Sequence, residues 1–239
     1  MMKHTLLSSA LIIASITSIS TQSEAEAAEL SINITNLTNG TYFTPVLVAG
    51  HNAETSLFTS GTMASEALKK MAEGGDIGDL DAMIIGADGV TVTNPAEGLL
   101  APATSVNDIM LTTSDSQNYL SIVAMLLPTN DGFVGLSSWP IPTTAGTYTI
   151  MLNGYDAGSE KNNELINGGG ALGTLGIPVD PGMHGGTDGA GIDDLSENNN
   201  VHIHPGVLGD MDNTGGISDL DSRVHRWLNP VAKVTVTVK

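Results

Sequence analysis

The sequence predicts a mainly β fold with many loops. Gly and Pro are frequent, at 28 and 10 of 239 residues, whereas charged residues make up only 14% of the chain. Turn-rich chains with few charges usually fold as β-proteins. Alternating apolar and polar residues at 30–35 and 234–238 are typical of strands with one buried face. Because 41% of the residues are hydrophobic, we expect a packed core rather than a disordered chain.

Further strands are expected where apolar residues cluster between turn signals. The run at 119–127 is continuously apolar, which predicts a central strand buried on both faces. Four other segments have strand character, at 43–48, 90–93, 105–112 and 146–152. The stretch 154–200 is rich in Gly, Asn and Asp without periodicity, so we expect one long loop region there.

One amphipathic helix is expected between Ser60 and Glu73. Apolar residues recur there at helical spacing, Glu66 precedes Lys70 by four residues, and a Gly pair follows. Its expected N-cap is Ser60 or Thr62.

The charge balance and the lack of cysteine exclude several classes of function. Lys and Arg number 8 against 26 Asp and Glu, for a net charge of −18. Such a chain has no basic stripe for nucleic acid or for an anionic membrane surface. With no cysteine, disulfides, thiolate metal sites and cysteine nucleophiles are also excluded.

The N-terminus has the pattern of a secretory signal peptide. Lys3 precedes an apolar run at 6–19, and Ala25-Glu26-Ala27 fits a cleavage site. We expect cleavage near Ala27, a single domain at 28–239, and a secreted or periplasmic location. The alternative is a buried N-terminal helix. The run is too short for a membrane span, and no later stretch reaches about 18 apolar residues.

Two acidic loops follow predicted strands. Asp131 comes after the apolar run at 119–127, and Asp156 and Glu160 come after the strand at 146–152. If these strand ends lie together, the three carboxylates can converge on one cation, with Gly158 permitting the sharp turn. Oxygen ligands on loops suit Ca²⁺. The alternative is that these are solvated turn carboxylates.

These loops and two other segments resemble the spondin N-terminal domain family. The similarity covers about residues 30–239, and its motifs are Asn130-Asp131-Gly132-Phe133-Val134-Gly135, Tyr155-Asp156-Ala157-Gly158-Ser159-Glu160, Leu57-Phe58-x-x-Gly61-x-x-Ala64-Ser65-x-x-Leu68 with Ala72-Glu73-x-Gly75, and Trp227-x-Asn229-Pro230-Val231-Ala232-x-Val234.

The resemblance implies an antiparallel β-sandwich of about eight core strands, with one or two short helices and long Gly/Asn/Asp-rich loops. It also implies an extracellular protein that binds matrix or surface partners, and one Ca²⁺ held by Asp131, Asp156 and Glu160. The backbone carbonyl of Asn153 is a further implied ligand. Glu160 departs from the family pattern, which has Asp there; the charge is kept and one methylene is added.

A second acidic segment resembles a twelve-residue calcium loop. Asp210 and Asp212 stand at positions 1 and 3, Gly215 at position 6 and Asp221 at position 12. No helix precedes it in the sequence pattern. An acidic hairpin joining two strands is therefore the favoured interpretation, with a second Ca²⁺ as the alternative.

Histidines offer a different hypothesis. His202 and His204 are two residues apart on a predicted strand, so both point to one face. With His51 and His225 they could gather into a Zn, Cu or Ni site, with Asp210 or Asp219 as a supporting carboxylate. Core histidines bonded to backbone carbonyls are the alternative.

The preferred hypothesis is an exported, non-enzymatic adhesion or recognition module whose loops are ordered by Ca²⁺. Its expected partner is an extracellular or cell-surface protein or glycan. Two alternatives stay open: a metal-dependent enzyme built on the histidines, and a purely structural surface protein. No G-x-S-x-G nucleophile elbow, phosphate loop or dinucleotide motif with its strand–helix frame is present in the sequence.

Overall fold

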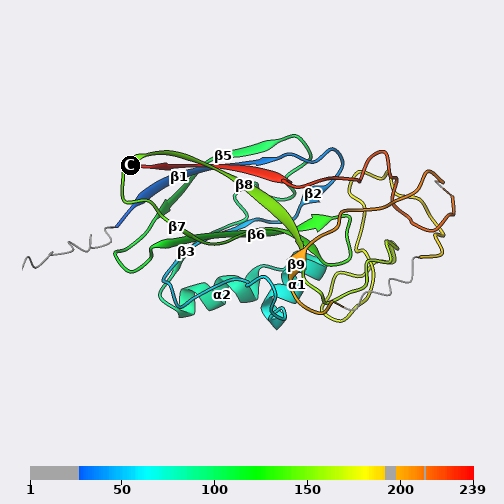
Figure 1. Cartoon of the computed structure of the whole chain (residues 1–239), viewed down its shortest axis with the longest axis horizontal. Helices are drawn as coiled ribbons and strands as arrows, with labels where there is room; N and C mark the ends of the chain where they lie inside the picture. Colours follow the sequence, from blue (N-terminus) through cyan, green and yellow to red (C-terminus); the bar gives the residue numbers. More distant parts are fainter. Residues whose placement is uncertain (1–26, 192–197, 213) are drawn as a thin grey trace, which may run out of the picture.

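The computed structural model describes residues 27–191, 198–212 and 214–239. Strands dominate, and two helices cover one outer face (Figure 1). The expected mainly β, antiparallel fold with short helices is confirmed. The predicted signal peptide falls almost wholly in residues 1–26, outside the described residues. The elements are β1 (Glu29–Asn36), β2 (Tyr42–Phe43), β3 (Leu47–His51), α1 (Glu66–Gly74), α2 (Gly78–Gly86), β4 (Val90–Thr93), β5 (Ser105–Thr112), β6 (Tyr119–Leu127), β7 (Gly132–Pro140), β8 (Gly146–Asp156), β9 (His202–Ile203) and β10 (Ala232–Val238).

Strand β8 joins two sheets into a sandwich. The strand order is β4-β3-β6-β7-β8-β10-β1-β5, and the paired neighbours are antiparallel. Residues 146–152 of β8 pair with β10, whereas residues 153–156 pair with β7. Because β8 changes partners along its length, it passes from one sheet to the other, and the two sheets enclose an apolar core.

Strand β6 is buried on both faces, as its continuous apolar sequence predicts. Its inward-facing residues pack in the core between the sheets, and they are Leu120, Ile122, Ala124 and Leu126. The alternate residues Val123, Met125 and Leu127 pack in a second apolar cluster, which includes residues of α1 and α2. The helices therefore bury the face of this sheet that a two-layer sandwich would leave in water.

The alternating strands at the two ends of the chain pair with each other. In β1, Leu30, Ile32 and Ile34 are buried, and β10 contributes Val234 and Val236 to the same core. The register places Ile32 opposite Val236. The period-2 pattern therefore predicted these strands correctly, because one face of each is buried.

Two sequence predictions in this region need correction. The segment expected as one strand at 43–48 is divided into β2 and β3 around Pro45, which cannot donate a ladder hydrogen bond. The predicted helix begins later than expected: Ser65, not Ser60 or Thr62, is the N-cap, and its side chain accepts from the Leu68 N–H.

The helical region also differs from the sequence prediction in its ion pairs and in its length. Lys69 pairs with Glu66 at 2.8 Å, whereas Lys70 reaches Asp79 on α2, so the expected Glu66–Lys70 pair is wrong. Helix α2 was not predicted, because its sequence GDLDAMIIG begins and ends with Gly and has no side-chain N-cap.

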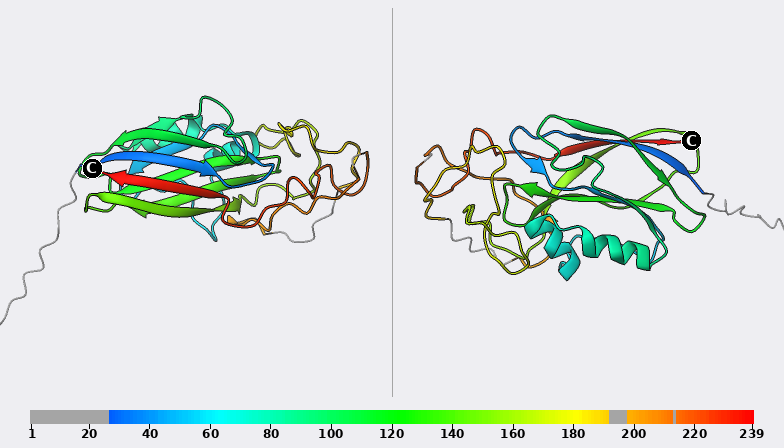
Figure 2. Two further views of the ribbon diagram at one scale, coloured as in Figure 1. Left: turned by 90° about the horizontal axis from the view of Figure 1, so that it is seen from above. Right: turned by 180° about the vertical axis from the view of Figure 1, so that it is seen from behind.

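The loops gather at one end of the sandwich. Figure 2 shows the segments after β8 and before β10 extending from one pole, while the C-terminus lies at the other. The loop region expected at 154–200 begins later, because β8 continues to Asp156 where it pairs with β7. Within the described parts of 157–201 there is no helix or strand.

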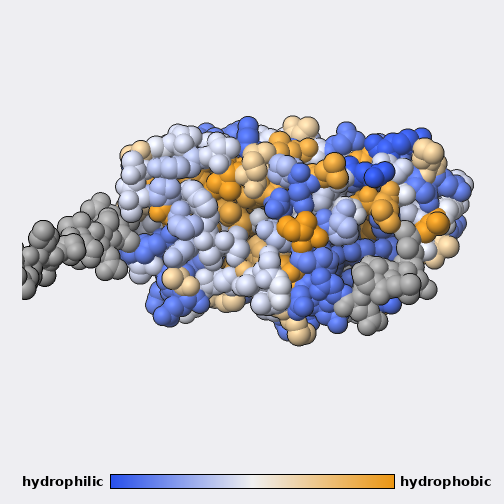
Figure 3. Space-filling view, viewed as in Figure 1, coloured by the Kyte–Doolittle hydropathy of each residue, from blue (hydrophilic) through white to orange (hydrophobic). Residues whose placement is uncertain are grey.

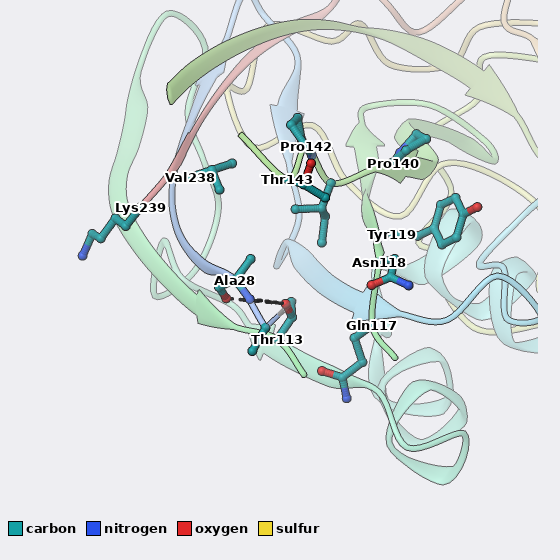
Figure 4. Close-up of a pocket in the computed structure, with 12 residues that line it drawn as sticks. Ala28, Thr113, Gln117, Asn118, Tyr119, Pro140, Pro142, Thr143, Val238 and Lys239 are labelled. Atoms are coloured by element: carbon teal, nitrogen blue, oxygen red, sulfur yellow. Dashed lines mark hydrogen bonds between the residues drawn. The ribbon is translucent and has the colours of Figure 1, made fainter. Parts of the chain in front are cut away.

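The opposite pole carries a cavity of about 220 Å³. Figure 4 shows its wall, where the Thr113 hydroxyl bridges to the backbone of Ala28. Its described lining is uncharged except for Lys239 at the chain end. The acidic loops and this cavity therefore lie at opposite ends of the molecule.

The cap of α1 gives a direct test of the helix start. Ser65→Ala removes the acceptor for the Leu68 N–H and should lower the free energy of unfolding by about 1 kcal/mol. Ser60→Ala, at the cap position that the sequence suggested, should leave stability unchanged within about 0.5 kcal/mol. Chemical denaturation of both variants measures this. Equal effects of the two substitutions would contradict the observed cap.

Candidate functional site: the carboxylates at the loop pole

The β6–β7 turn and the end of β8 lie side by side. Gly132, the first residue of β7, pairs with Asp156, the last residue of β8. The Ala157 N–H donates to the Asp131 carbonyl at 3.2 Å. The strand pairing therefore brings together the two acidic loops that are 25 residues or more apart in sequence.

The carboxylate of Asp131 is fully buried, and only one of its two oxygens accepts hydrogen bonds from the described residues. Its Oδ2 accepts from the Ser159 N–H at 2.7 Å, the Ser159 hydroxyl at 3.2 Å and the Glu160 N–H at 3.0 Å. Its Oδ1 is buried and has no hydrogen-bond partner in the described chain. Burial, together with the neighbouring charge of Asp156, raises the pKa of Asp131 to about 7. A proton or a cation at Oδ1 would relieve this destabilisation.

Asp156 closes the turn that the sequence suggested. Its Oδ1 accepts from the Gly158 N–H at 2.7 Å, and Gly158 has a φ of +68°, a conformation that favours glycine. Its Oδ2 accepts from the Asn162 amide at 2.6 Å. The ring of His202 lies 3.8 Å from Oδ1.

Glu160 points elsewhere. Its Oε2 accepts from the Gly176 N–H at 2.9 Å and from the Asn130 amide at 3.3 Å, and its buried Oε1 has no partner among the described residues. Burial raises the pKa of Glu160, and the charge of Glu73 adds to this effect. The Glu160 carboxylate therefore bonds to Asn130 and to the loop around Gly176, whereas its backbone N–H donates to Asp131.

Within the described ranges, no three or more His, Asp or Glu side chains form a group that could hold a metal ion. Asn153, whose carbonyl the family resemblance implies as a ligand, lies in β8 opposite Gly135 and three residues before Asp156. The loops that carry the predicted ligands are together, but their three carboxylates are not turned toward one point.

The segment 210–221 is held by its own hydrogen bonds. Asp210 accepts from the N–H groups of Asp212, Ile217 and Ser218. Asp221, expected at position 12 of a calcium loop, is bound by the Arg223 guanidinium. An isolated bridge joins Asp210 to Asp221, and this bridge is parallel. The expected acidic hairpin joining two strands is therefore wrong: the segment is a closed loop between β9 and β10, because a hairpin would require antiparallel pairing.

His51 and His225 lie in separate environments. His51 bonds to the Ser121 hydroxyl and the Asn52 carbonyl, each at 2.8 Å, and burial lowers its pKa. His225 is fully buried, and its Nε2 lies 3.4 Å from Asp180.

His202 and His204 flank Asp156. His202 contacts the Asn200 carbonyl at 2.8 Å. His204 accepts the Gly206 N–H at Nδ1, so its proton sits on Nε2, which is buried without a partner in the described chain. Burial lowers the pKa of His204 to about 4. The structure thus does not bring the four histidines of the predicted transition-metal site together.

The sequence reasoning missed the role of three buried carboxylates that hold the loop pole together, although it named Asp219 as a possible supporting carboxylate of a histidine site. Glu164 accepts from the N–H groups of Leu208 and Gly209 and from the Ser218 hydroxyl. Asp219 accepts from the N–H groups of Ile166 and Gly189, and Asp180 accepts from those of Gly182, His184 and Gly185. A small apolar cluster of Ile177, Val207 and Leu220 lies among them. The only sequence signal was the excess of Asp and Gly.

Another carboxylate ties the helices to this pole. Glu73, on α1, is buried and accepts from the Gly173 N–H at 3.0 Å. Its motif position was noted in the sequence, but its loop partner lies 100 residues away.

An antiparallel β-sandwich that presents hydrogen-bonded acidic loops at one pole is a loop-presenting recognition scaffold. The family model described as Spondin_N matches residues 35–164, more than half of the chain, and the chain belongs to this family. Its members are extracellular recognition-type domains. The match includes Asp131, Asp156 and Glu160, and it ends at Glu164.

No curated protein gives a significant match to the chain. Among the described residues, no helix has the length and apolar character that crossing a membrane requires.

The pKa of Asp180 predicts how the stability of the fold depends on pH. Burial alone would raise its pKa, but the neighbouring His225 ring, whose Nε2 lies 3.4 Å away, and the hydrogen bonds from the N–H groups of Gly185 and His184 outweigh it and lower the pKa to about 2. A folded-state pKa below the unfolded value contributes stability above about pH 4 that is lost as the pH falls toward 2. At pH 6, Asp180→Asn should therefore be less stable than the wild type by about 1–3 kcal/mol.

The difference between wild type and Asp180→Asn should disappear near pH 2. Urea unfolding followed by tryptophan fluorescence, to which Trp227, two residues from His225, contributes, measures it at each pH. Asp188→Asn, an exposed carboxylate in the same loop, is the matched control and should show no such dependence. A pH-independent difference would contradict the role assigned to Asp180.

Proposed function

We propose that this chain is a non-enzymatic, exported recognition domain whose loop pole is organised by one Ca²⁺ at Asp131, Asp156 and Glu160. Membership of the Spondin_N family supports the extracellular and recognition parts of the proposal. The observation that carries the cation is the free Oδ1 of Asp131, a buried carboxylate oxygen with no partner among the described residues, beside the charge of Asp156.

The chemistry of the donors fits a hard divalent cation. Carboxylate and carbonyl oxygens are the ligands that Ca²⁺ takes, about 6–8 in number. Asp131 and Asp156 would supply the first two carboxylates, and Asn153 would supply a backbone carbonyl. When bound, the cation would provide the positive charge that offsets the burial of two neighbouring carboxylates.

Glu160 would couple cation binding to the conformation of the loop around Gly176. Its carboxylate accepts from Gly176 and Asn130, so it must give up these bonds to join Asp131 and Asp156. Cation binding would therefore alter the contacts of the loop around Gly176. A sandwich clusters its loops at its ends, where loops serve as binding surfaces. This supports a cation that shapes a surface rather than one that performs catalysis.

Calcium binding can be tested by thermal melts in EDTA and in added Ca²⁺, with elemental analysis for stoichiometry. A ligand at 100 times its Kd stabilises by about 2.7 kcal/mol, which for a chain of this size raises Tm by about 5–10 °C. One Ca²⁺ per chain is expected; two would assign an ion to the 210–221 loop as well. An unchanged Tm together with no bound Ca²⁺ would refute the site.

The variant Asp131→Asn separates cation binding from folding. It removes the charge and keeps the shape, so the Ca²⁺-dependent rise in Tm should be lost. In EDTA, the variant should be at least as stable as the wild type near pH 8, because the repulsion with Asp156 is gone. Asp108→Asn is the matched control on β5, and it should keep the full response to Ca²⁺. If both variants keep that response, the ion lies elsewhere.

A further inference from the structure

A groove opens where β7 and β8 separate. The two strands pair only between residues 132–135 and 153–156; beyond these, β8 turns to β10 while β7 stays with β6. The separation leaves a groove of about 460 Å³ on the outer face, with the 56–60 loop as its wall. Figure 3 shows hydrophobic side chains gathered along the opening between β7 and β8, on a face that is otherwise largely hydrophilic. We name this feature the β7–β8 groove; its lining includes Ser56, Phe58, Ser137, Met151, Asn153 and Tyr155.

Aromatic rings form one side of the β7–β8 groove. The ring centroids of Phe58 and Tyr155 are 4.9 Å apart. Gly135 permits this approach, because a Cβ there would lie 2.6 Å from the Phe58 ring and 3.1 Å from Tyr155. Met151 and Asn153 alternate with Tyr155 along β8, so all three point to the outer face. Met151 is half exposed.

The polar groups of the groove are uncharged and rich in acceptors. None of its lining residues carries a charge, in a chain with 26 acidic residues. The hydroxyls of Ser56 and Ser137 both donate to the Phe58 carbonyl, at 2.7 and 2.6 Å. Because both hydroxyl protons are engaged in these bonds, the two serine oxygens can offer only their lone pairs to a ligand in the groove. The Asn153 amide makes no hydrogen bond to the described residues.

This chemistry selects one class of ligand. Phosphates and carboxylates are acceptors only and would find no cationic partner here, and amines would find no carboxylate. A neutral sugar ring has hydroxyl donors for the serine lone pairs and the Asn153 amide, and it has an apolar C–H face for an aromatic ring. We propose that the β7–β8 groove binds a neutral saccharide.

The proposed sugar site does not depend on the proposed cation. Asp131, Asp156 and Glu160 do not line the groove. Asn153 belongs to both proposals through different groups: its backbone carbonyl would face the cation, whereas its side-chain amide would contact the sugar. Sugar binding should therefore persist in EDTA. The saccharide site and the calcium site are therefore separate proposals, and an experiment can refute either one without refuting the other.

The test is isothermal titration calorimetry and NMR titration of the full chain in EDTA. The probes are maltotriose, cellotriose, mannotriose and triacetylchitotriose, with trigalacturonate as an acidic probe. At least one neutral trisaccharide should bind and trigalacturonate should not. Binding of none of the neutral probes, or preferential binding of the acidic one, would overturn the proposal. Binding that requires Ca²⁺ would also overturn it, because it would assign the sugar to the cation site.

Matched variants locate the sugar. Asn153→Ala should weaken binding about tenfold, the effect of losing one or two hydrogen bonds to a neutral ligand. Met151→Ala should weaken it as well, whereas Met110→Ala should not. The two methionines lie on strands with exposed fractions of 50% and 49%, but only Met151 lines the groove. Thermal melts verify that each variant is folded, and equal affinities of all three would exclude this groove.

Discussion

Buried carboxylates that accept backbone N–H groups are the interaction on which the loop pole depends. The described parts of 157–201 form no helix or strand, so their N–H groups need acceptors of another kind. Asp180 accepts three such groups from its own loop, and Asp219 accepts two from distant loop residues. Glu164 does the same for the neighbouring segment, where it accepts the N–H groups of Leu208 and Gly209. The acidic composition is therefore in part a structural device and not only surface charge.

Asp131 uses the same interaction but leaves it incomplete. One of its oxygens accepts two N–H groups and a hydroxyl, and the other oxygen is buried without a partner among the described residues. Glu164 differs, because both its oxygens accept hydrogen bonds. An unsatisfied buried carboxylate beside Asp156 is costly, which is why a cation is the natural complement at this position.

The change of partners along β8 shapes two features of the outer face. Where β8 pairs with β7, it fixes Asp156 beside the β6–β7 turn and closes the acidic pole. Where it leaves β7 for β10, it opens the β7–β8 groove. One bend in a strand therefore places an acidic pole and an uncharged groove next to each other, with different chemistry.

The sequence by itself determined most of the strands, because burial imposes a period of two on β1 and β10 and a continuous apolar run on β6. It did not predict β7, and it left the meeting of the acidic loops as a condition that only the β7–β8 pairing fulfilled. The motifs around Asp131 and Asp156 indicated the family. Only the tertiary structure decided where side chains point: Glu160 toward Gly176, His225 toward Asp180 and Glu73 toward Gly173. These contacts join residues up to 100 positions apart, and no local pattern encodes them, since Gly-rich loops acquire their conformation from the groups that they enclose.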